Sequence, residues 1–238
     1  MKLFLIRYTK IIFTYLHLHV FFNLFSKFFL HLVYLGKFSS WANSNKKITF
    51  NDFPAKWDYN KRFSLYEWVL NSENISNSPI NYVEFGVAQG QSIRWFVQQN
   101  ANPGSRFYGF DTFTGLPEDF GVYKKGAFNM KNEIPVIPDK RVKFYQGLFQ
   151  QTVPSFLPGL DNTRRNVVMM DADLYSATLY ALSSLAPFLK KGDIIFFDEF
   201  AVPLHEFRAF QDFTQSFYVD LKLVAAASNY YFAAFKVV

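Results

Sequence analysis

Four apolar runs in the middle of the chain each end at a glycine or an acid, and these end residues could do chemistry. The runs are Tyr82–Phe85, Tyr108–Phe110, Val167–Met170 and Ile194–Phe197, and they are followed by Gly86, Asp111, Asp171 and Asp198. Parallel strands present their carboxyl ends at one edge of a sheet, where α/β proteins bind nucleotide-like ligands. The order of the segments therefore predicts one site at this edge.

The first strand end carries a glycine turn, Glu84-x-Gly86-x-x-x-Gly90-x-Ser92. We expect Gly86 to let the backbone turn tightly and Gly90 to let a ligand approach the main chain. Ser92 is expected to cap the next helix, whose amino end favours polar ligand groups. The alternative is a turn that serves only packing. The dinucleotide fingerprint G-x-G-x-x-G is absent, which argues against a nicotinamide cofactor.

Asp111 ends the second strand roughly twenty residues after the turn, where an acid binds ribose hydroxyls in nucleotide-like cofactors. A lone aspartate at a strand end would serve as a cap, but the preceding glycine turn favours a ribose ligand. His205 stands at the head of a later helix, near the same edge. It is a candidate catalytic base, and the alternative is a histidine that starts the helix or packs against it.

Composition and charge narrow the classes of protein. A chain of 238 residues is long enough for one α/β domain and an appendage. It has no cysteine, which excludes a disulfide scaffold, a thiolate metal site and a cysteine nucleophile. The net charge of +6 arises in residues 1–47, which hold seven bases and no acid. The rest of the chain therefore gives no support for nucleic-acid binding.

Strand and helix patterns alternate regularly from residue 80 onward. The sequence predicts strands at 80–85, 106–110, 142–145, 167–170, 194–197, 221–226 and 230–237, and helices at 61–70, 92–99, 175–189 and 205–217. We expect a doubly wound α/β fold with a mostly parallel, seven-stranded sheet and a reversed last strand. This is the Rossmann-like arrangement of class I methyltransferases. Residues 112–141 form a long irregular stretch, and such loops are usually functional lids or disordered.

Residues 1–47 are predicted to form a helical extension, and residues 48–238 the domain. The apolar stretch 3–38 is interrupted by polar residues on different faces, so two short helices or a kinked helix fit it best. Its longest charge-free part, 11–26, is shorter than the roughly 20 residues of a membrane span. We expect the extension to lie on an anionic membrane surface. The alternatives are a helical cap or dimer element, and a signal peptide or true span.

Four strings, in this order, resemble the macrocin O-methyltransferase family, which methylates sugar hydroxyls of macrolides and related glycosides. They are Tyr108-Gly-Phe-Asp-Thr-Phe-Thr-Gly-Leu-Pro-Glu118, Gly147-Leu-Phe-Gln-Gln-Thr-Val-Pro154, Met170-Asp-Ala-Asp-Leu-Tyr-Ser-Ala-Thr178 and Gly192-Asp-Ile-Ile-Phe-Phe-Asp-Glu199. The resemblance covers residues 60–217. The family's Asp-Asp pair is Asp198-Glu199 in this chain, and its Gly-Gly before that strand is Lys191-Gly192.

The resemblance implies the cofactors. S-adenosylmethionine would be bound by the glycine turn together with Asp111, Thr112 and Gly147.

A divalent metal, Mg²⁺, would be held by Asp171, Asp198 and Glu199, with Asp173 beside them as a further ligand or general base. Chemistry agrees with this implication. Hard oxygen ligands suit Mg²⁺, and a metal on a sugar hydroxyl lowers its pKa, so that a carboxylate can remove the proton. The alternative is that these acids are strand-end caps that face water.

The sequence thus predicts a metal-assisted, S-adenosylmethionine-dependent O-methyltransferase acting on a hydroxyl of a sugar or glycoside. One alternative is a methyltransferase of a catechol-like or other diol. The other is a membrane-tethered binding protein that keeps the fold without the chemistry. The expected partners are a small-molecule or glycan acceptor, an anionic membrane surface through residues 1–47, and a second copy in a homo-oligomer. The expected location is the cytoplasm, peripheral at the inner membrane face.

Overall fold

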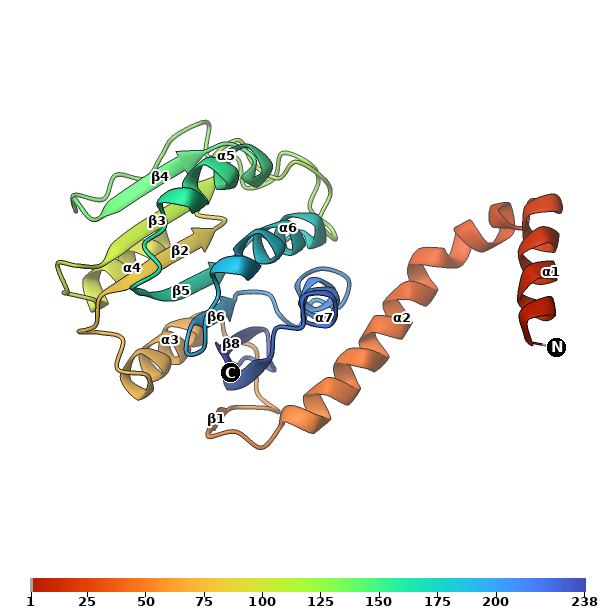
Figure 1. Cartoon of the computed structure of the whole chain (residues 1–238), viewed down its shortest axis with the longest axis horizontal. Helices are drawn as coiled ribbons and strands as arrows, with labels where there is room; N and C mark the ends of the chain where they lie inside the picture. The colour runs from red at the N-terminus through yellow and green to blue at the C-terminus, as the bar shows by residue number, and fades with distance from the viewer. Residues whose placement is uncertain (1) are drawn as a thin grey trace.

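One mixed sheet forms the centre of the molecule in the computed structural model, which describes residues 2–238 (Figure 1). Its strands are β1 (Phe50–Asn51), β2 (Ile80–Phe85), β3 (Arg106–Asp111), β4 (Val142–Gln146), β5 (Arg165–Met170), β6 (Ile194–Phe197), β7 (Leu221–Ala227) and β8 (Phe232–Val237). Their order is β1-β7-β8-β6-β5-β2-β3-β4. Only the pairs that involve β8 are antiparallel among the described residues.

The helices are α1 (Lys2–Tyr15), α2 (His19–Asn45), α3 (Lys61–Ser72), α4 (Gln91–Gln99), α5 (Phe149–Phe156), α6 (Tyr175–Leu185) and α7 (Glu206–Phe217). Helices α3 to α7 cover both faces of this sheet. Helices α3 and α4 pack on one face with Tyr82, Phe107 and Phe196. On the other face, α5, α6 and α7 pack with Val83, Phe110 and Phe197. Residues of one strand alternate between the two cores, as the pleat requires.

The structure confirms the predicted class, a mostly parallel doubly wound sheet with a reversed last strand. The sheet has eight strands instead of the predicted seven, because Phe50–Asn51 pairs in parallel with β7. Two residues are too few to give a periodic pattern. Helix α5 was also absent from the prediction, since Pro154 lies inside it. The other predicted elements occur with ends shifted by a few residues, which is normal for element boundaries.

The N-terminal extension forms two helices, α1 and α2, whose axes meet at 108°. This confirms the prediction of two short helices or a kinked one. No single helix of the described chain is long and apolar enough to cross a membrane, although the bent pair together passes that test. Figure 1 shows the first half of α2, and α1 beyond it, projecting away from the sheet.

The second half of α2 belongs to the core of the domain. Tyr34 is buried, and Phe38 and Trp41 pack against the same cluster as α7 and β8. The Trp41 ring lies 4.8 Å from that of Phe200 and 5.9 Å from that of Phe235, measured between centroids. The last turns of the extension predicted over residues 1–47 therefore pack in the same hydrophobic core as the sheet.

We predict that Trp41→Ala lowers the free energy of unfolding by about 3 kcal/mol, because it removes a large aromatic side chain from a packed cluster. Urea denaturation followed by circular dichroism measures this change. Phe28→Ala is the matched control on the projecting half of α2, where the side chain is 60% exposed. It should change stability by less than about 0.5 kcal/mol. Equal losses in both variants would contradict the docking of α2.

Candidate active site

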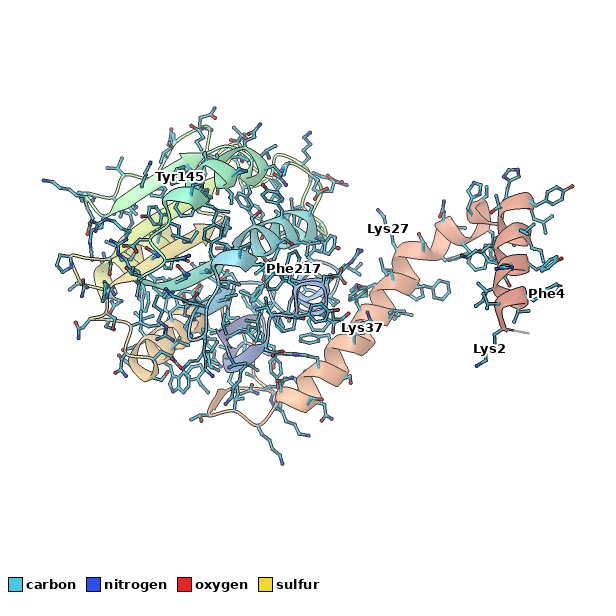
Figure 2. All side chains as sticks on the ribbon, viewed as in Figure 1. Lys2, Phe4, Lys27, Lys37, Tyr145 and Phe217 are labelled. Carbon is cyan, nitrogen blue, oxygen red and sulfur yellow. The ribbon has the colours of Figure 1, made fainter. Side chains whose placement is uncertain are left out.

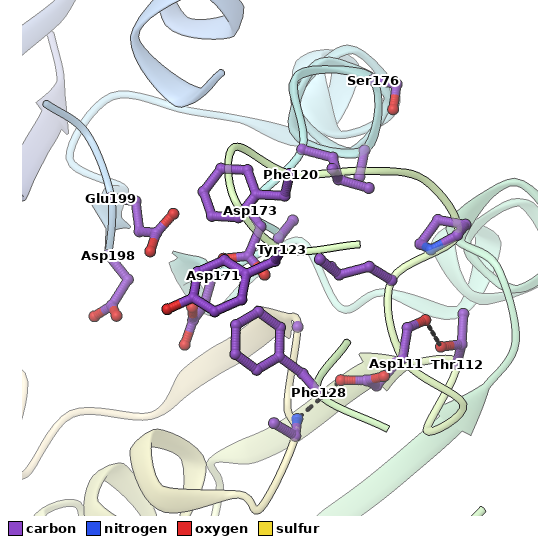
Figure 3. A pocket seen from close by; sticks show the side chains of 18 of the residues that line it. Asp111, Thr112, Phe120, Tyr123, Phe128, Asp171, Asp173, Ser176, Asp198 and Glu199 are labelled. Atoms are coloured by element: carbon purple, nitrogen blue, oxygen red, sulfur yellow. Dashed lines mark hydrogen bonds between the residues drawn. The ribbon is translucent and has the colours of Figure 1, made fainter. Parts of the chain in front are cut away.

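A cavity of about 460 Å³ opens at the carboxyl ends of the parallel strands (Figure 3). Its walls come from the segment before α3, the β2–α4 turn, the β3 end with the loop 112–141, the start of α5, and the ends of β5 and β6. The lining includes Trp57, Tyr59, Gly86, Ala88, Asp111, Thr112, Phe120, Tyr123, Phe128, Gln150, Asp171, Asp173, Asp198, Glu199 and Tyr231. The predicted edge of the sheet therefore carries the site, with a volume typical of small-molecule pockets.

A glycine is required at position 86 because the ends of β2 and β5 approach each other closely there. Its φ is +91°, and a Cβ atom there would lie 1.7 Å from the carbonyl oxygen of Asp171. The tight turn predicted at Gly86 is thus confirmed, and the β5 backbone fills the place where a side chain would be. This contact sets the glycine turn beside the acids at the end of β5.

Asp111 lies at the end of β3, in the cavity wall, as predicted. Its Oδ2 accepts hydrogen bonds from the backbone N–H groups of Val87 and Ala88, both at 2.8 Å, and its Oδ1 accepts one from Phe113 at 2.7 Å. An ionised carboxylate has about four acceptor sites. Asp111 therefore fixes the shape of the glycine turn and keeps acceptor capacity toward the cavity.

The other predicted cofactor residues divide into two groups. Thr112 lines the cavity, and its hydroxyl donates to the Gly115 carbonyl oxygen. Glu84, Gly90, Ser92 and Gly147 do not line it.

The reasons differ from residue to residue. Glu84 is fully buried under the turn and accepts a hydrogen bond from the Tyr82 hydroxyl. At Gly90, Pro135 of the loop makes a close approach, 3.0 Å from an added Cβ. Ser92 does not cap α4, since Gly90 occupies the N-cap position and no side-chain cap bond forms there.

Five carboxyl groups gather at the ends of β5 and β6: Asp171, Asp173, Asp198, Glu199 and Glu206. Burial raises the pKa of all of them, and their mutual repulsion adds to the effect for most. The pKa of Asp173 rises to about 6 and that of Glu199 to about 8. Glu206 accepts a hydrogen bond from the backbone N–H of Glu199. Asp171, Asp173, Asp198 and Glu199 line the cavity, and Glu206 is buried behind them, so these acids do not cap strand ends in water.

A buried arginine from α3 faces this cluster. Arg62 is 2% exposed, and its guanidinium lies 4.1 Å from the ring centroid of Tyr59 and 4.8 Å from that of Phe63. It donates to Gln91 Oε1 at 2.7 Å and to Asp198 Oδ2 at 3.5 Å. The site therefore contains a fixed positive charge next to the end of β6.

Two of the three predicted metal ligands, Asp198 and Glu199, accept hydrogen bonds from protein groups. Asp198 Oδ1 accepts from the Tyr66 hydroxyl at 3.0 Å, and its Oδ2 from Arg62. Glu199 Oε1 accepts from the Tyr231 hydroxyl at 2.6 Å, while its Oε2 is buried without a partner. Within residues 2–238, no group of three or more His, Cys, Asp or Glu side chains is arranged to hold one metal ion. In this arrangement the predicted ligands do not form a metal centre.

His205 does not line the cavity. It precedes α7, its ring packs edge-on against Phe120 at 4.7 Å, and burial lowers its pKa. The structure thus places it as a packing residue behind the loop 112–141. The same loop is fixed to α6 by a hydrogen bond from the Ser176 hydroxyl to Glu118, so this long stretch is an ordered wall of the cavity.

Sequence reasoning missed Arg62, Tyr66, Tyr231 and Glu206. The first two had a signal, because Arg62 occupies one position of the apolar stripe Arg62, Leu65, Tyr66 and Val69 on α3. A charge in such a stripe indicates a buried ion with a partner. Tyr231 and Glu206 carried no comparable pattern.

The sheet order with its reversed last strand, the glycine turn and the cavity beside it define a class I methyltransferase fold. Residues 83–200 match the family described as a methyltransferase domain. This segment, which runs from within β2 to just past β6, is therefore similar to a methyltransferase domain and contains the glycine turn and the acids at the ends of β5 and β6.

Several known proteins are similar to this chain. The 8-demethyl-8-(2,3-dimethoxy-alpha-L-rhamnosyl)-tetracenomycin-C 4'-O-methyltransferase of Streptomyces olivaceus is 26% identical over 174 residues, and the match covers 62% of this chain and 65% of that protein. Among solved structures, the calicheamicin methyltransferase CalS11 superposes with a TM-score of 0.56 at 23% identity, over 75% of this chain and 78% of its own. The O-methyltransferase NovP superposes with a TM-score of 0.54 at 19% identity, over the same shares. The structural similarity confirms the fold.

We predict that Glu84→Gln flattens the decline of stability with rising pH. Burial, opposed by the hydrogen bond from Tyr82, raises the pKa of Glu84 from 4.5 to about 8. The folded state therefore binds more protons than the unfolded state between these values, so this group's contribution is complete below pH 4.5 and is lost as the pH rises through 8.

Urea denaturation at pH 5, 6, 7 and 8 checks this prediction. The exposed Glu133→Gln variant is the control and should keep the slope of the parent protein. An unchanged slope in folded Glu84→Gln would show that Glu84 is already ionised at neutral pH.

Proposed function

We propose that the protein is an S-adenosylmethionine-dependent O-methyltransferase that acts on a hydroxyl group of a sugar or glycoside. The observation that carries this proposal is a single cavity whose lining includes both the glycine turn and a group of carboxyl groups beside it. The Streptomyces relative, named for methylation of a rhamnosyl group, supports a sugar as the acceptor.

The donor would occupy the half of the cavity beside the glycine turn. Ala88, Asp111 and Thr112 line this half, and Asp111 already holds the turn through two backbone N–H groups. Gln150, near the start of α5, adds a polar group with both donor and acceptor capacity. This half thus offers backbone, hydroxyl and carboxylate groups for a ribose and an amino acid moiety.

The acceptor would occupy the half beside the acids. Trp57, Tyr59 and Tyr231 line it, and aromatic faces with polar edges suit the apolar faces and hydroxyl groups of a sugar ring. Asp173 protrudes between this wall and the donor half (Figure 3). Its φ is +59°, an uncommon conformation for a residue with a Cβ atom.

Asp173 is the proposed general base. It takes the proton of the acceptor hydroxyl while the oxygen attacks the methyl carbon of the donor; the carbon–sulfur bond breaks, and S-adenosylhomocysteine leaves with the electron pair on sulfur. Asp198 is less suitable because Arg62 and Tyr66 occupy its two oxygens. Glu199 is less suitable because Tyr231 donates to one of its oxygens and because burial raises its pKa to about 8, so that it holds its proton at neutral pH. The cavity walls hold the donor carbon and acceptor oxygen in line, which supplies much of the rate.

The extension gives the proposed location. Seven bases without an acid, joined to exposed apolar side chains, support a peripheral protein at an anionic membrane surface.

We predict that Asp173→Asn lowers kcat by about 10² to 10⁴, the usual contribution of a general base. The affinity for S-adenosylmethionine should stay within about twofold, because the donor half does not contact this carboxylate. Calorimetry measures the affinity, and mass spectrometry of methylated rhamnosides measures the rate. Asp220→Asn, at an exposed position, is the matched control. Full activity in Asp173→Asn would remove this residue from the mechanism.

The magnesium requirement implied by the family resemblance stays a prediction. It requires Asp198 to exchange its bonds with Arg62 and Tyr66 for a metal. Exhaustive chelation, checked by metal analysis, tests it: activity lost on chelation and restored by Mg²⁺ would support the requirement. Unchanged activity would leave Arg62 as the positive charge beside the acids.

A further inference from the structure

We infer that the cavity mouth faces the same lipid surface as α1 and α2, so that the acceptor is the sugar headgroup of a membrane-held glycolipid. This inference rests on the methyl transfer proposed above. Four observations support the inference: an exposed apolar surface, the charges of residues 1–47, the direction of the strands and the volume of the cavity.

The apolar surface is concentrated in one part of the chain. Of the 33 large hydrophobic side chains that are exposed in the described residues, 21 lie between Leu3 and Leu35. Figure 2 shows these side chains standing free of the domain. A surface of this kind marks an interaction site, since soluble monomers rarely expose large contiguous apolar patches.

Apolar side chains surround most of α1, and bases interrupt them on part of its circumference only. Phe4, Tyr8 and Ile12 lie on a side without bases, and Arg7 and Lys10 lie on a side that also carries Leu3 and Ile6. An amphipathic helix with aromatic and aliphatic residues on one side and bases on the other is typical of interfacial helices.

On α2, the apolar side comprises Phe21, Phe25 and Phe28, which are 64%, 42% and 60% exposed. Tyr34 lies on the opposite side of the helix and is buried against the domain, within 5.6 Å of the Arg208 guanidinium. Because α2 packs on the domain through Tyr34, its phenylalanine side faces away from the domain.

The charges of residues 1–47 favour a lipid surface over a second copy of this chain as the partner of the extension. Residues 1–47 carry seven bases and no acid, so pairing this segment with its own copy would bring like charges together. Anionic lipids supply the complementary charge, at about 1 kcal/mol for each base near the surface.

The cavity opens toward the projecting helices. In Figure 1, strands β2, β3 and β4 point to the side on which α1 and the first half of α2 stand. The loop 112–141, which follows the end of β3, forms one wall of the cavity at this edge of the sheet.

This loop continues the apolar surface to the rim. Val122 is 88% exposed, and Tyr123 and Phe128 are about half exposed while they also line the cavity. Lys124 and Lys125 follow directly in the sequence. The rim therefore repeats the combination of apolar and basic side chains found on α1 and α2.

The size of the cavity limits the acceptor. A volume of about 460 Å³ lies within the range that holds one drug-sized ligand, so the donor and one sugar ring would fill it. A large aglycone must then remain outside, on the apolar rim formed by Tyr123 and Phe128. A lipid chain left in the bilayer satisfies this requirement.

Flotation of the full-length protein with phosphatidylglycerol and phosphatidylcholine vesicles tests the surface without donor or acceptor. We expect binding to vesicles that contain phosphatidylglycerol. Replacing Lys2, Arg7 and Lys10 by Gln should weaken binding about fivefold per base. Replacing Phe21, Phe25 and Phe28 by Ser should abolish it, whereas Phe217→Ser with Tyr218→Ser, a control pair exposed on the domain, should have no effect. Absence of binding at every composition, with dimerisation that is lost in the phenylalanine variant, would assign the surface to a second copy.

A fluorescent label tests the orientation. The chain has no cysteine, so Val122→Cys and Ala101→Cys each provide one thiol for an environment-sensitive dye. Val122 lies on the loop beside the cavity, and Ala101 precedes β3 at the opposite end of the sheet. On phosphatidylglycerol vesicles the dye should shift to the blue at position 122 and not at position 101. Flotation without a shift at 122 would overturn the orientation.

An assay of methyl transfer distinguishes failure of the lipid-linked acceptor from failure of the proposed methyltransferase activity. Transfer to a long-chain alkyl rhamnoside in phosphatidylglycerol vesicles should exceed transfer to methyl rhamnoside in solution at least tenfold, and the phenylalanine variant should remove the difference. Equal rates on the two acceptors would overturn the lipid-linked acceptor and leave the methyltransferase intact. Binding of S-adenosylmethionine in calorimetry tests the methyltransferase itself, and its absence would count against the proposed function while the flotation result stands.

Discussion

Carboxyl groups in a partly buried cluster need a positive charge or protons, and this constraint organises the site. Taking an ionised carboxylate out of water is costly, so such groups either pair with a cation or retain protons. Burial raises the pKa of Asp173, Glu199 and Glu206, and also that of Asp198, on which the charge of its partner Arg62 acts in the opposite direction. The site therefore combines acids that tend to retain protons with one guanidinium packed against the rings of Tyr59 and Phe63.

That guanidinium also connects the two halves of the cavity. Arg62 donates to Gln91, the first residue of α4, which follows directly on the glycine turn. It also donates to Asp198 at the end of β6. Because buried charge pairs are costly to break, the donor turn and the acids are held in a fixed relation through α3. The contact of Gly86 with the Asp171 carbonyl oxygen fixes the same two walls from the backbone side.

The order of the sheet and the position of the site could be predicted from the sequence because both depend on local patterns. Apolar runs give the strands, and the residues after them must meet at one edge. Cavity-lining residues such as Asp111 and Asp173 were found in this way. Side-chain direction and partners could not be predicted, because they depend on neighbours distant in sequence. Asp198, for example, accepts hydrogen bonds from Arg62 and Tyr66 on a helix more than a hundred residues earlier.

For the extension, too, the sequence predicts the composition of the surface but not its orientation. Its composition predicts an apolar, basic surface, but only the docking of Tyr34 and Trp41 determines which way that surface faces. A helix that was free to rotate would present its apolar side in any direction, and the cavity would have no fixed relation to a membrane. Because the last turns of α2 lie in the same core as Phe197 of β6, the orientation of the extension and that of the cavity are set by one rigid cluster. Under the proposed anchoring, the enzyme would meet acceptors held in the same surface, and its selectivity would arise from where the sugar is presented as well as from contacts with the sugar itself.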